Sequence, residues 1–168
     1  QAAYSATLST VLAIPVAKAL LRQKFWGKNF VVLILGAPFI LPVIVAVLGL
    51  ILVFGNNGIV NNLLNLIGLG SIKIYGFWGV ILAHVFFNLP LAIRILLQAF
   101  NDMPGEQYRL VSSLKLSSAQ KFLVLEWPVL KKVFPGVWAV IFAICLSSFA
   151  VALTLGGGPK ATTVELAI

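Results

Sequence analysis

Four apolar stretches of this sequence are each long enough to cross a lipid bilayer. They are residues 2–21, 30–54, 76–100 and 133–155, and the second and fourth contain no charged residue. A helix rises about 1.5 Å per residue, so roughly 20 residues cover a hydrocarbon core of about 30 Å. A soluble domain of this size has no core large enough to hide four such helices. The sequence therefore predicts an all-α integral membrane protein, a polytopic helical bundle with about four transmembrane helices.

The charged residues are sorted by loop, and this sorting predicts the orientation of the chain. Most of the cations lie near the end of the first stretch and in the loops after the first and third stretches: Lys18, Arg22, Lys24 and Lys28, and then Arg109, Lys115, Lys121, Lys131 and Lys132. The alternate loops hold only Lys73 and Lys160. Because Lys and Arg resist translocation, we expect loops 22–29 and 101–132 in the cytoplasm and the Gln1 end outside.

Composition narrows the chemistry further. The chain is 61% hydrophobic and 10% charged, against about 25% charged residues in soluble domains. The net charge is +8, but the cations are distributed by loop as expected for a membrane protein. No nucleic-acid partner is therefore predicted. Cys145 is the only cysteine, and no Cys/His spacing suggests a metal site. None of the four acidic residues lies in the second, third or fourth stretch, so we predict no catalytic residues and no enzyme.

Residues 1–168 are expected to form a single transmembrane domain that is cut from a longer chain at both ends. Gln1 is not an initiator Met, and the first apolar stretch begins almost at residue 1. Residues 164–168 look like the start of another span.

Several local signals predict how the spans bend and pack. Pro38 and Pro42 should bend the second stretch, because proline lacks a backbone donor. The outer loop 55–75 has apolar residues at helical spacing and predicts a short interfacial helix, with an Asn-rich loop as the alternative. Small residues one turn apart predict close helix packing: Ala2, Ala6 and Thr10 in the first stretch, and Ala139, Ala143 and Ser147 in the fourth.

The third stretch carries a polar stripe. At 100° per residue, four side chains fall within a sector of about 120°: His84, Asn88, Arg94 and Gln98. Polar groups are costly in lipid, so the stripe should face the bundle interior. It is a candidate lining for a polar pathway, and hydrogen bonding between helices is the other interpretation, which we favour for His84.

The inner segment 101–132 is too apolar for a plain linker. Five residues could form an exposed apolar face between basic residues: Tyr108, Val111, Leu114, Phe122 and Leu125. Pro104 can begin a helix, and serines such as Ser117 offer helix caps. Two short helices joined by a turn are predicted. The physics leaves open whether they form a docking surface or rest on lipid.

The layout of this segment resembles the permease subunits of binding-protein-dependent ABC importers. That family carries Glu-Ala-Ala, three residues, Gly, nine residues and then Ile-x-Leu-Pro. Setting Pro128 on the final Pro places the other motif positions on Arg109-Leu110-Val111, Lys115, Leu125 and Trp127. The resemblance implies that segment 101–132 seats in a groove of the ATPase. It assigns this coupling to Pro104, Tyr108, Arg109, Leu110, Val111, Leu114, Lys115, Leu125 and Pro128.

Within that family, residues 82–90, 126–128 and 155–168 are most similar to the thiamine-importing branch and share features with ferric-iron permeases. The resemblance implies an ATP-driven importer of thiamine or its phosphates in the bacterial inner membrane, with this chain as most of the first half of a double-length permease. The implied partners are ATPase subunits that hold ATP and Mg, a periplasmic binding protein and the second permease half. This chain would need no cofactor, and only a weak substrate site, or none, is expected in its spans. Ferric iron or another small solute is the alternative cargo, and a passive channel is the alternative of another class.

Overall fold

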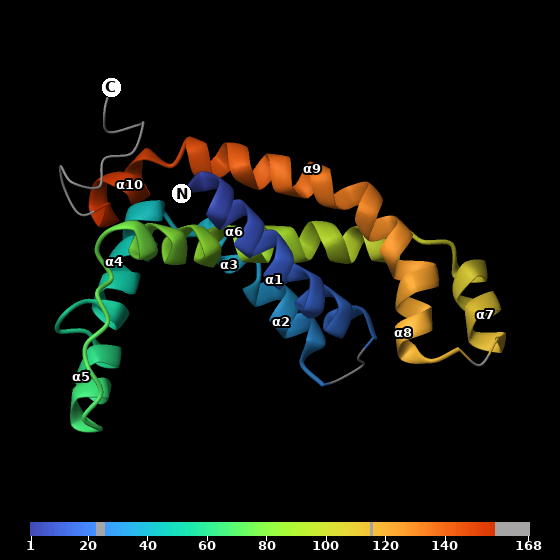
Figure 1. Ribbon diagram of the computed structural model, residues 1–168, viewed down its shortest axis with the longest axis horizontal. Helices are drawn as coiled ribbons and strands as arrows, with labels where there is room; N and C mark the ends of the chain where they lie inside the picture. The colour runs from blue at the N-terminus through green and yellow to red at the C-terminus, as the bar shows by residue number, and fades with distance from the viewer. Residues whose placement is uncertain (23–25, 115, 157–168) are drawn as a thin grey trace.

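The computed structural model describes residues 1–22, 26–114 and 116–156, apart from the side chains of Phe39, Tyr108 and Ser112. Every regular element in these ranges is helical (Figure 1). The elements are α1 (Ala2–Arg22), α2 (Lys28–Ile34), α3 (Ala37–Ile40), α4 (Val43–Phe54), α5 (Ile59–Leu66), α6 (Phe77–Asn101), α7 (Gly105–Ser113), α8 (Ser118–Lys121), the π-helix η1 (Phe122–Glu126), α9 (Trp127–Leu146) and α10 (Phe149–Leu155). The expectations placed on Lys24, Lys115, Lys160 and 164–168 lie outside the described residues.

Four helical stretches in the described ranges are long and apolar enough to cross a membrane. They are Ala2–Arg22, Val43–Leu66, Phe77–Asn101 and Ser118–Leu146. The predicted polytopic all-α architecture is therefore confirmed, and the chain is a multi-pass membrane protein. Two of the stretches are displaced from their predicted limits, because helix breaks occur inside residues 30–54 and 133–155.

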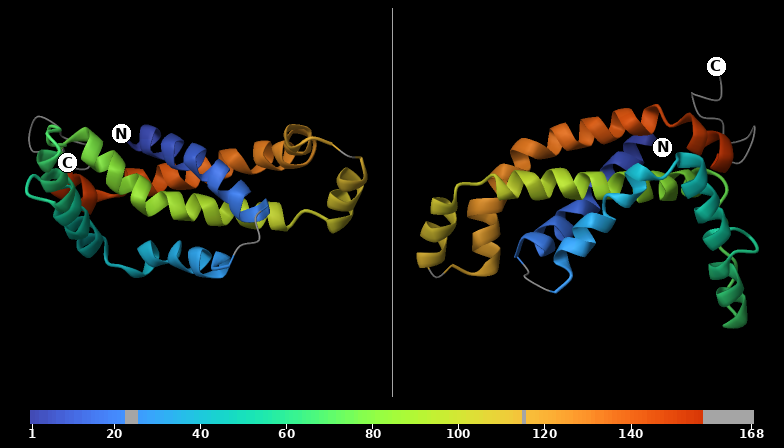
Figure 2. Two further views of the ribbon diagram at one scale, coloured as in Figure 1. Left: turned by 90° about the horizontal axis from the view of Figure 1, so that it is seen from below. Right: turned by 180° about the vertical axis from the view of Figure 1, so that it is seen from behind.

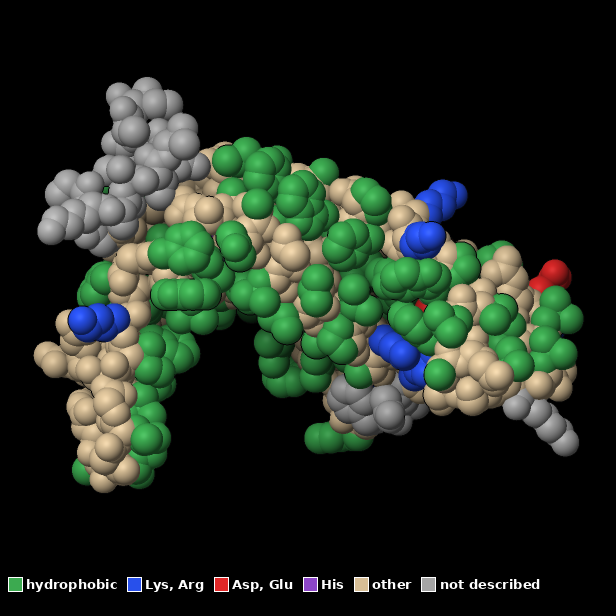
Figure 3. Space-filling view, viewed as in Figure 1, with side chains coloured by type: hydrophobic (Ala, Val, Ile, Leu, Met, Phe, Trp, Pro, Cys, Tyr) green, Lys and Arg blue, Asp and Glu red, His purple; other side chains and the backbone are tan. Residues whose placement is uncertain are grey.

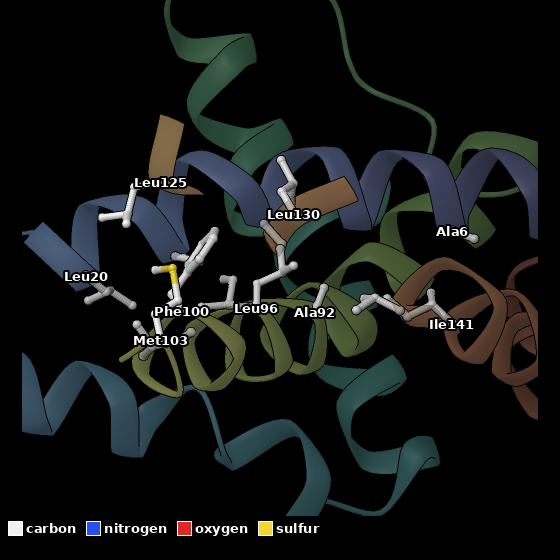
Figure 4. Close-up of a cluster of buried hydrophobic side chains, with 14 of the residues drawn as sticks. Ala6, Leu20, Ala92, Leu96, Phe100, Met103, Leu125, Leu130 and Ile141 are labelled. Carbon is white, nitrogen blue, oxygen red and sulfur yellow. The ribbon is translucent and has the colours of Figure 1, made fainter. Parts of the chain in front are cut away.

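Helix α6 is the centre of the bundle, and α1 and α9 pack along it (Figures 1 and 2). The core between them is formed by the side chains labelled in Figure 4, among them Ala6, Leu20, Ala92, Leu96, Phe100, Leu130 and Ile141. The face that α1 buries consists mainly of Ala, Ser and Thr, which brings its backbone close to α6 as predicted. The same prediction for α9 is wrong within this chain, because Ala139 and Ala143 are exposed while Val137, Ile141 and Cys145 are buried.

The stretch predicted as a second span, 30–54, is divided into α2, α3 and α4. Leu41 is extended, with φ −76° and ψ 132°, and Pro42 is the N-cap of α4. A proline disfavours the α conformation in the residue before it, so the chain leaves the helix at Leu41. The break turns α4 and α5 crosswise to α6 (Figures 1 and 2). A bend was predicted from Pro42, but a complete interruption was not.

The outer segment is held together by Asn61. The short helix predicted within 55–75 is present as α5, and the buried Asn61 side chain bonds to both neighbouring segments. Its Nδ2 donates to the carbonyls of Gly55 at 2.8 Å and Ile72 at 2.9 Å, and its Oδ1 accepts from the Ile72 amide at 2.7 Å. This amide therefore connects the α4–α5 turn to the segment that leads from α5 to α6.

The last predicted span, 133–155, is interrupted as well. Helix α9 begins at Trp127, so Pro128 lies in its first turn instead of closing the preceding loop, and the helix ends at Leu146. The hydroxyl of Ser147 donates to the carbonyl of Ala143 at 3.1 Å, and that of Ser148 donates to the carbonyl of Cys145 at 2.8 Å. The Ala143 carbonyl also accepts from the Ser147 amide at 3.1 Å, so the two hydroxyls add hydrogen bonds to the last carbonyls of α9.

Charge and apolar surface are distributed unequally over the molecule. Figure 3 shows hydrophobic side chains over the body of the bundle, and Lys and Arg side chains mostly around the end that carries α7 and α8. Exposed hydrophobic side chains include Leu8, Leu12, Leu48, Leu52, Val140 and Ile144. An apolar body with cations gathered at one end fits a bundle surrounded by lipid.

Candidate functional site

The inner segment folds as two short helices followed by one turn of π-helix. Pro104 is the N-cap of α7, and Ser117 begins α8 with a capping box. The Ser117 hydroxyl accepts from the Gln120 amide at 3.3 Å, and the Gln120 side chain accepts from the Ser117 amide at 2.9 Å. The predicted pair of helices and the predicted serine cap are both present. Helix α8 then continues through η1 into α9 without a loop.

The residues expected to couple to an ATPase divide into an exposed and a buried group. Leu110 and Leu114 are 66% and 64% exposed, and Pro104, Arg109 and Pro128 are exposed as well. Val111 and Leu125 are each only 8% exposed and belong to the core, so the prediction that they form an exposed face is wrong. The reason is that α7 and η1 pack against each other and leave these two side chains inside. Lys115 and the Tyr108 side chain lie outside the described residues.

The C-terminal end of α1 contacts the inner segment at η1. Arg22 donates to the same carboxylate oxygen of Glu126 from Nε at 2.8 Å and from Nη2 at 2.5 Å. The side chain of Glu126 is 4% exposed. One turn earlier in α1, the Lys18 ammonium lies 4.1 Å from the centre of the Phe122 ring. A charge pair and a cation–π contact thus join the first membrane helix to the turn that leads into α9.

A cavity of about 600 Å³ lies between the two broken helices and α6. It is lined from the α3–α4 break by Pro38, Leu41 and Val43, from α6 by His84, Phe87 and Asn88, and from the α9–α10 break by Ile144, Ser147, Ser148, Phe149, Ala150 and Val151. Non-helical backbone at membrane depth is tolerated where it is buried in protein or lines a cavity, and both breaks meet that condition here.

His84 is 1% exposed, and hydroxyl groups from α1 and from the α9–α10 break lie within hydrogen-bond distance of its ring. Nδ1 lies 3.2 Å from Ser5 Oγ, and Nε2 lies 2.5 Å from Ser148 Oγ. The Ser148 hydroxyl also lies 2.8 Å from the Cys145 carbonyl, an arrangement in which Ser148 donates to that carbonyl and can accept from Nε2. The contacts join α1, α6 and the α9–α10 break, as the packing interpretation of His84 predicts.

Asn88 lies one turn from His84 and is 3% exposed. Its Nδ2 donates to Cys145 Sγ at 3.3 Å, and sulfur is a weak acceptor. No described residue donates a hydrogen bond to its Oδ1. This oxygen is not fully enclosed by the described residues. Asn88 therefore brings an open amide oxygen to the cavity wall.

The other half of the predicted stripe does not share this environment. Arg94 and Gln98 are exposed in this chain, and neither lines the cavity beside His84. Arg94 borders a second cavity of about 550 Å³ with Asn29 and Gly36. The expectation that the whole stripe faces the interior is wrong within this chain, because different helices cover the two ends of α6.

Known proteins with similar sequences identify the family. The thiamine transport system permease protein of Escherichia coli is 47% identical over 169 residues, which are 100% of this chain and 32% of that protein. The corresponding permease of Brucella abortus is 41% identical over 170 residues, 100% of this chain and 31% of that protein. The chain belongs to the transport-system permeases. It spans about a third of the length of these relatives.

A more distant relative falls in the same class. The probable sulfate transport system permease protein of Chlorella vulgaris is 32% identical over 152 residues, 89% of this permease chain and 53% of that protein. No family model matches the chain. The similarity to the thiamine permeases covers every region described above, including the inner segment and both helix breaks.

Two features of this permease were missed by sequence reasoning. Arg22 was assigned only to the topology signal, and Glu126 only to a short run of resemblance, so their pairing was not foreseen. A usable signal existed, because Glu126 is the one acidic residue in the apolar run 122–130 and a buried carboxylate requires a partner. Ser147 was predicted to be a packing residue and Ser148 was given no role, although two adjacent hydroxyls inside an apolar span can also bond to backbone carbonyls at a break.

Proposed function

We propose that this permease is a membrane-spanning part of an ATP-driven importer that carries thiamine or its phosphates inward. The observation that carries this proposal is the similarity of the whole chain to thiamine transport system permeases, up to 47% identical in the bacterial relatives above. The four span-length helices supply the membrane path. The chain performs no chemistry itself, and ATP and Mg are held by partner ATPase subunits.

The inner segment is the proposed contact with the ATPase. Leu110 and Leu114 offer exposed apolar surface on and just after α7, and Arg109 adds a positive charge beside them. An apolar patch with a charged rim fits a protein partner better than a solvent-exposed linker. In this arrangement loops 22–29 and 101–132 face the cytoplasm, and the Gln1 end faces the side of the periplasmic binding protein. The membrane is the bacterial inner membrane.

Motion of the ATPase would reach the spans by two routes. The first is direct, since α8 continues through η1 into α9. The second passes from Glu126 to Arg22 and so to α1. A shift of α7 and α8 therefore displaces α1 and α9 together, and both helices pack on α6. Rigid helices linked in this way suit a two-state change between inward- and outward-open arrangements, in which the second permease half forms the other wall.

The direct test is transport by the full-length permease with its ATPase and binding protein in liposomes. Labelled thiamine should accumulate when ATP is hydrolysed, and it should not accumulate with a non-hydrolysable ATP analogue. Accumulation of ferric iron in place of thiamine would change the cargo to the alternative solute. Thiamine movement that is independent of ATP would identify a passive channel and contradict the importer.

A further inference from the structure

The cavity beside His84 is bordered by two interrupted helices instead of by continuous ones. Leu41 and Val43 come from the break between α3 and α4, and Ser147 and Ser148 come from the break between α9 and α10. These two breaks are far apart in the sequence, yet they meet on the same section of α6. Close packing alone would fill this space with side chains. The cavity is nevertheless about 600 Å³, within the range of roughly 300–1,000 Å³ that is typical of small-molecule sites.

We propose that this cavity is a substrate site inside the membrane, and that it takes a small, flat heteroaromatic solute that carries hydrogen-bond donors. The proposal rests on the proposed function, because it concerns the solute that the permease carries. It goes further by placing part of the recognition in this chain, where only a weak substrate site, or none, was expected.

The walls of the cavity suit a flat ring. Phe87 and Phe149 contribute aromatic rings from α6 and α10, and Ile144 and Val151 contribute aliphatic surface. Aromatic side chains hold planar ligands by stacked or edge-to-face contacts. Their negative faces also attract a positively charged ring. A heteroaromatic cation would therefore gain from the same aromatic walls.

The polar groups of the cavity present acceptors. Ser147 lines the cavity and donates its hydroxyl proton to backbone carbonyls, which leaves its oxygen as an acceptor, whereas the Ser148 oxygen is bonded to His84. Asn88 adds an amide oxygen to which no described residue donates. A solute with amino or ring N–H groups can donate to these oxygens.

The contacts of His84 hold this surface in place. The imidazole bonds to Ser148 and, on its other side, to Ser5 of α1. The orientation of the Ser148 hydroxyl is thereby set before any solute arrives. A site whose polar groups are positioned in advance loses less free energy on binding than one that must reorganise.

The test measures binding of labelled thiamine to the full-length permease–ATPase complex in nanodiscs, without the binding protein. Asn88→Leu removes the open acceptor at similar volume and should weaken binding about tenfold, which corresponds to about 1.4 kcal/mol. Ala150→Phe fills the cavity from α10 and should abolish saturable binding. Asn65→Leu removes an exposed amide on α5 that has no side-chain hydrogen bond among the described residues, so it is the matched control and should bind as the wild type does.

Each variant is first checked for co-purification with the ATPase and for its basal ATPase activity. If Asn88→Leu does not assemble, Ser147→Ala removes one acceptor with less disturbance and should weaken binding about threefold. Wild-type binding by Ala150→Phe together with wild-type binding by Asn88→Leu or Ser147→Ala would overturn the site. So would a wild-type complex that transports thiamine but does not bind it saturably, and both outcomes leave the proposed function standing. Failure of the wild type to transport thiamine with ATP would instead contradict the proposed function.

Discussion

Arg22 at the end of α1 and Glu126 at the end of η1 form an ion pair across 104 positions of sequence, with Nε 2.8 Å from Oε1. The pair lies where segment 101–132 enters the helical bundle. Its second carboxylate oxygen has no hydrogen-bond partner among the described residues. The pair connects the proposed ATPase contact to α1, which is far from segment 101–132 in the sequence.

Replacing Arg22 by Met should destabilise the permease more than replacing Glu126 by Gln. The first change leaves a buried carboxylate without its cation, which costs about 3 kcal/mol, whereas Gln keeps a neutral acceptor for Arg22. Thermal unfolding of the purified full-length protein measures both changes. Equal stability of the two variants and the wild type would show that the pair does not hold α1 to η1.

The same pair predicts a loss of coupling. Arg22→Gln should keep basal ATPase activity, because the ATPase itself is intact, but should lower thiamine uptake per ATP hydrolysed about threefold or more. The charge-exchanged double variant Arg22→Glu, Glu126→Arg should recover part of this ratio. Unchanged uptake per ATP in the single variant would remove the route through α1.

Leu114→Asp and Arg109→Glu should each reduce co-purification of the ATPase, because both side chains are exposed on the proposed contact surface. Placing a carboxylate in an apolar contact forces its desolvation, and reversing a charge reverses its attraction. Lys73→Glu is the matched control, since Lys73 is exposed in the loop that precedes α6, at the opposite end of the bundle. Wild-type recovery of the ATPase with both inner-segment variants would contradict the contact.

Asn61→Leu should destabilise the fold of segment 55–75 by about 2–4 kcal/mol. The change removes a fully buried amide and leaves the carbonyls of Gly55 and Ile72 and the Ile72 amide without it. Asn65→Leu on the same helix should fall within about 0.5 kcal/mol of the wild type, because that side chain is exposed. Local proteolysis of the 55–75 segment separates the two variants, and equal cleavage rates would refute the role given to Asn61.

Ala6→Leu tests the close contact between α1 and α6. Ala6 is fully buried, so the added atoms must displace neighbours and should cost about 1–3 kcal/mol. Ala3→Leu adds the same atoms on the exposed side of α1 and should change the thermal midpoint little. A midpoint for Ala6→Leu that matches that of Ala3→Leu would show that the helices are less closely packed.

The sequence was informative wherever a local rule decides the structure. Apolar length predicted the membrane helices, Ser117 and Gln120 form the expected kind of helix cap, and Pro42 marks the bend. Contacts between helices could not be derived, because they depend on how each helix is rotated about its axis. The Arg22–Glu126 and His84–Ser148 pairs are of this kind. The burial of Val111 and Leu125 was missed for the same reason, since each lies on an amphipathic turn that could face either lipid or protein.

The proposed coupling to an ATPase requires that segment 101–132 lie on the cytoplasmic side of the membrane. In the full-length permease in intact cells, Lys121→Cys and Lys73→Cys can be compared for labelling by a membrane-impermeant maleimide added from the outside. We expect the maleimide to label position 73 in intact cells, and to label position 121 only after the inner membrane is opened. Labelling of position 121 in intact cells would place the segment away from any cytoplasmic ATPase and would contradict the proposed coupling.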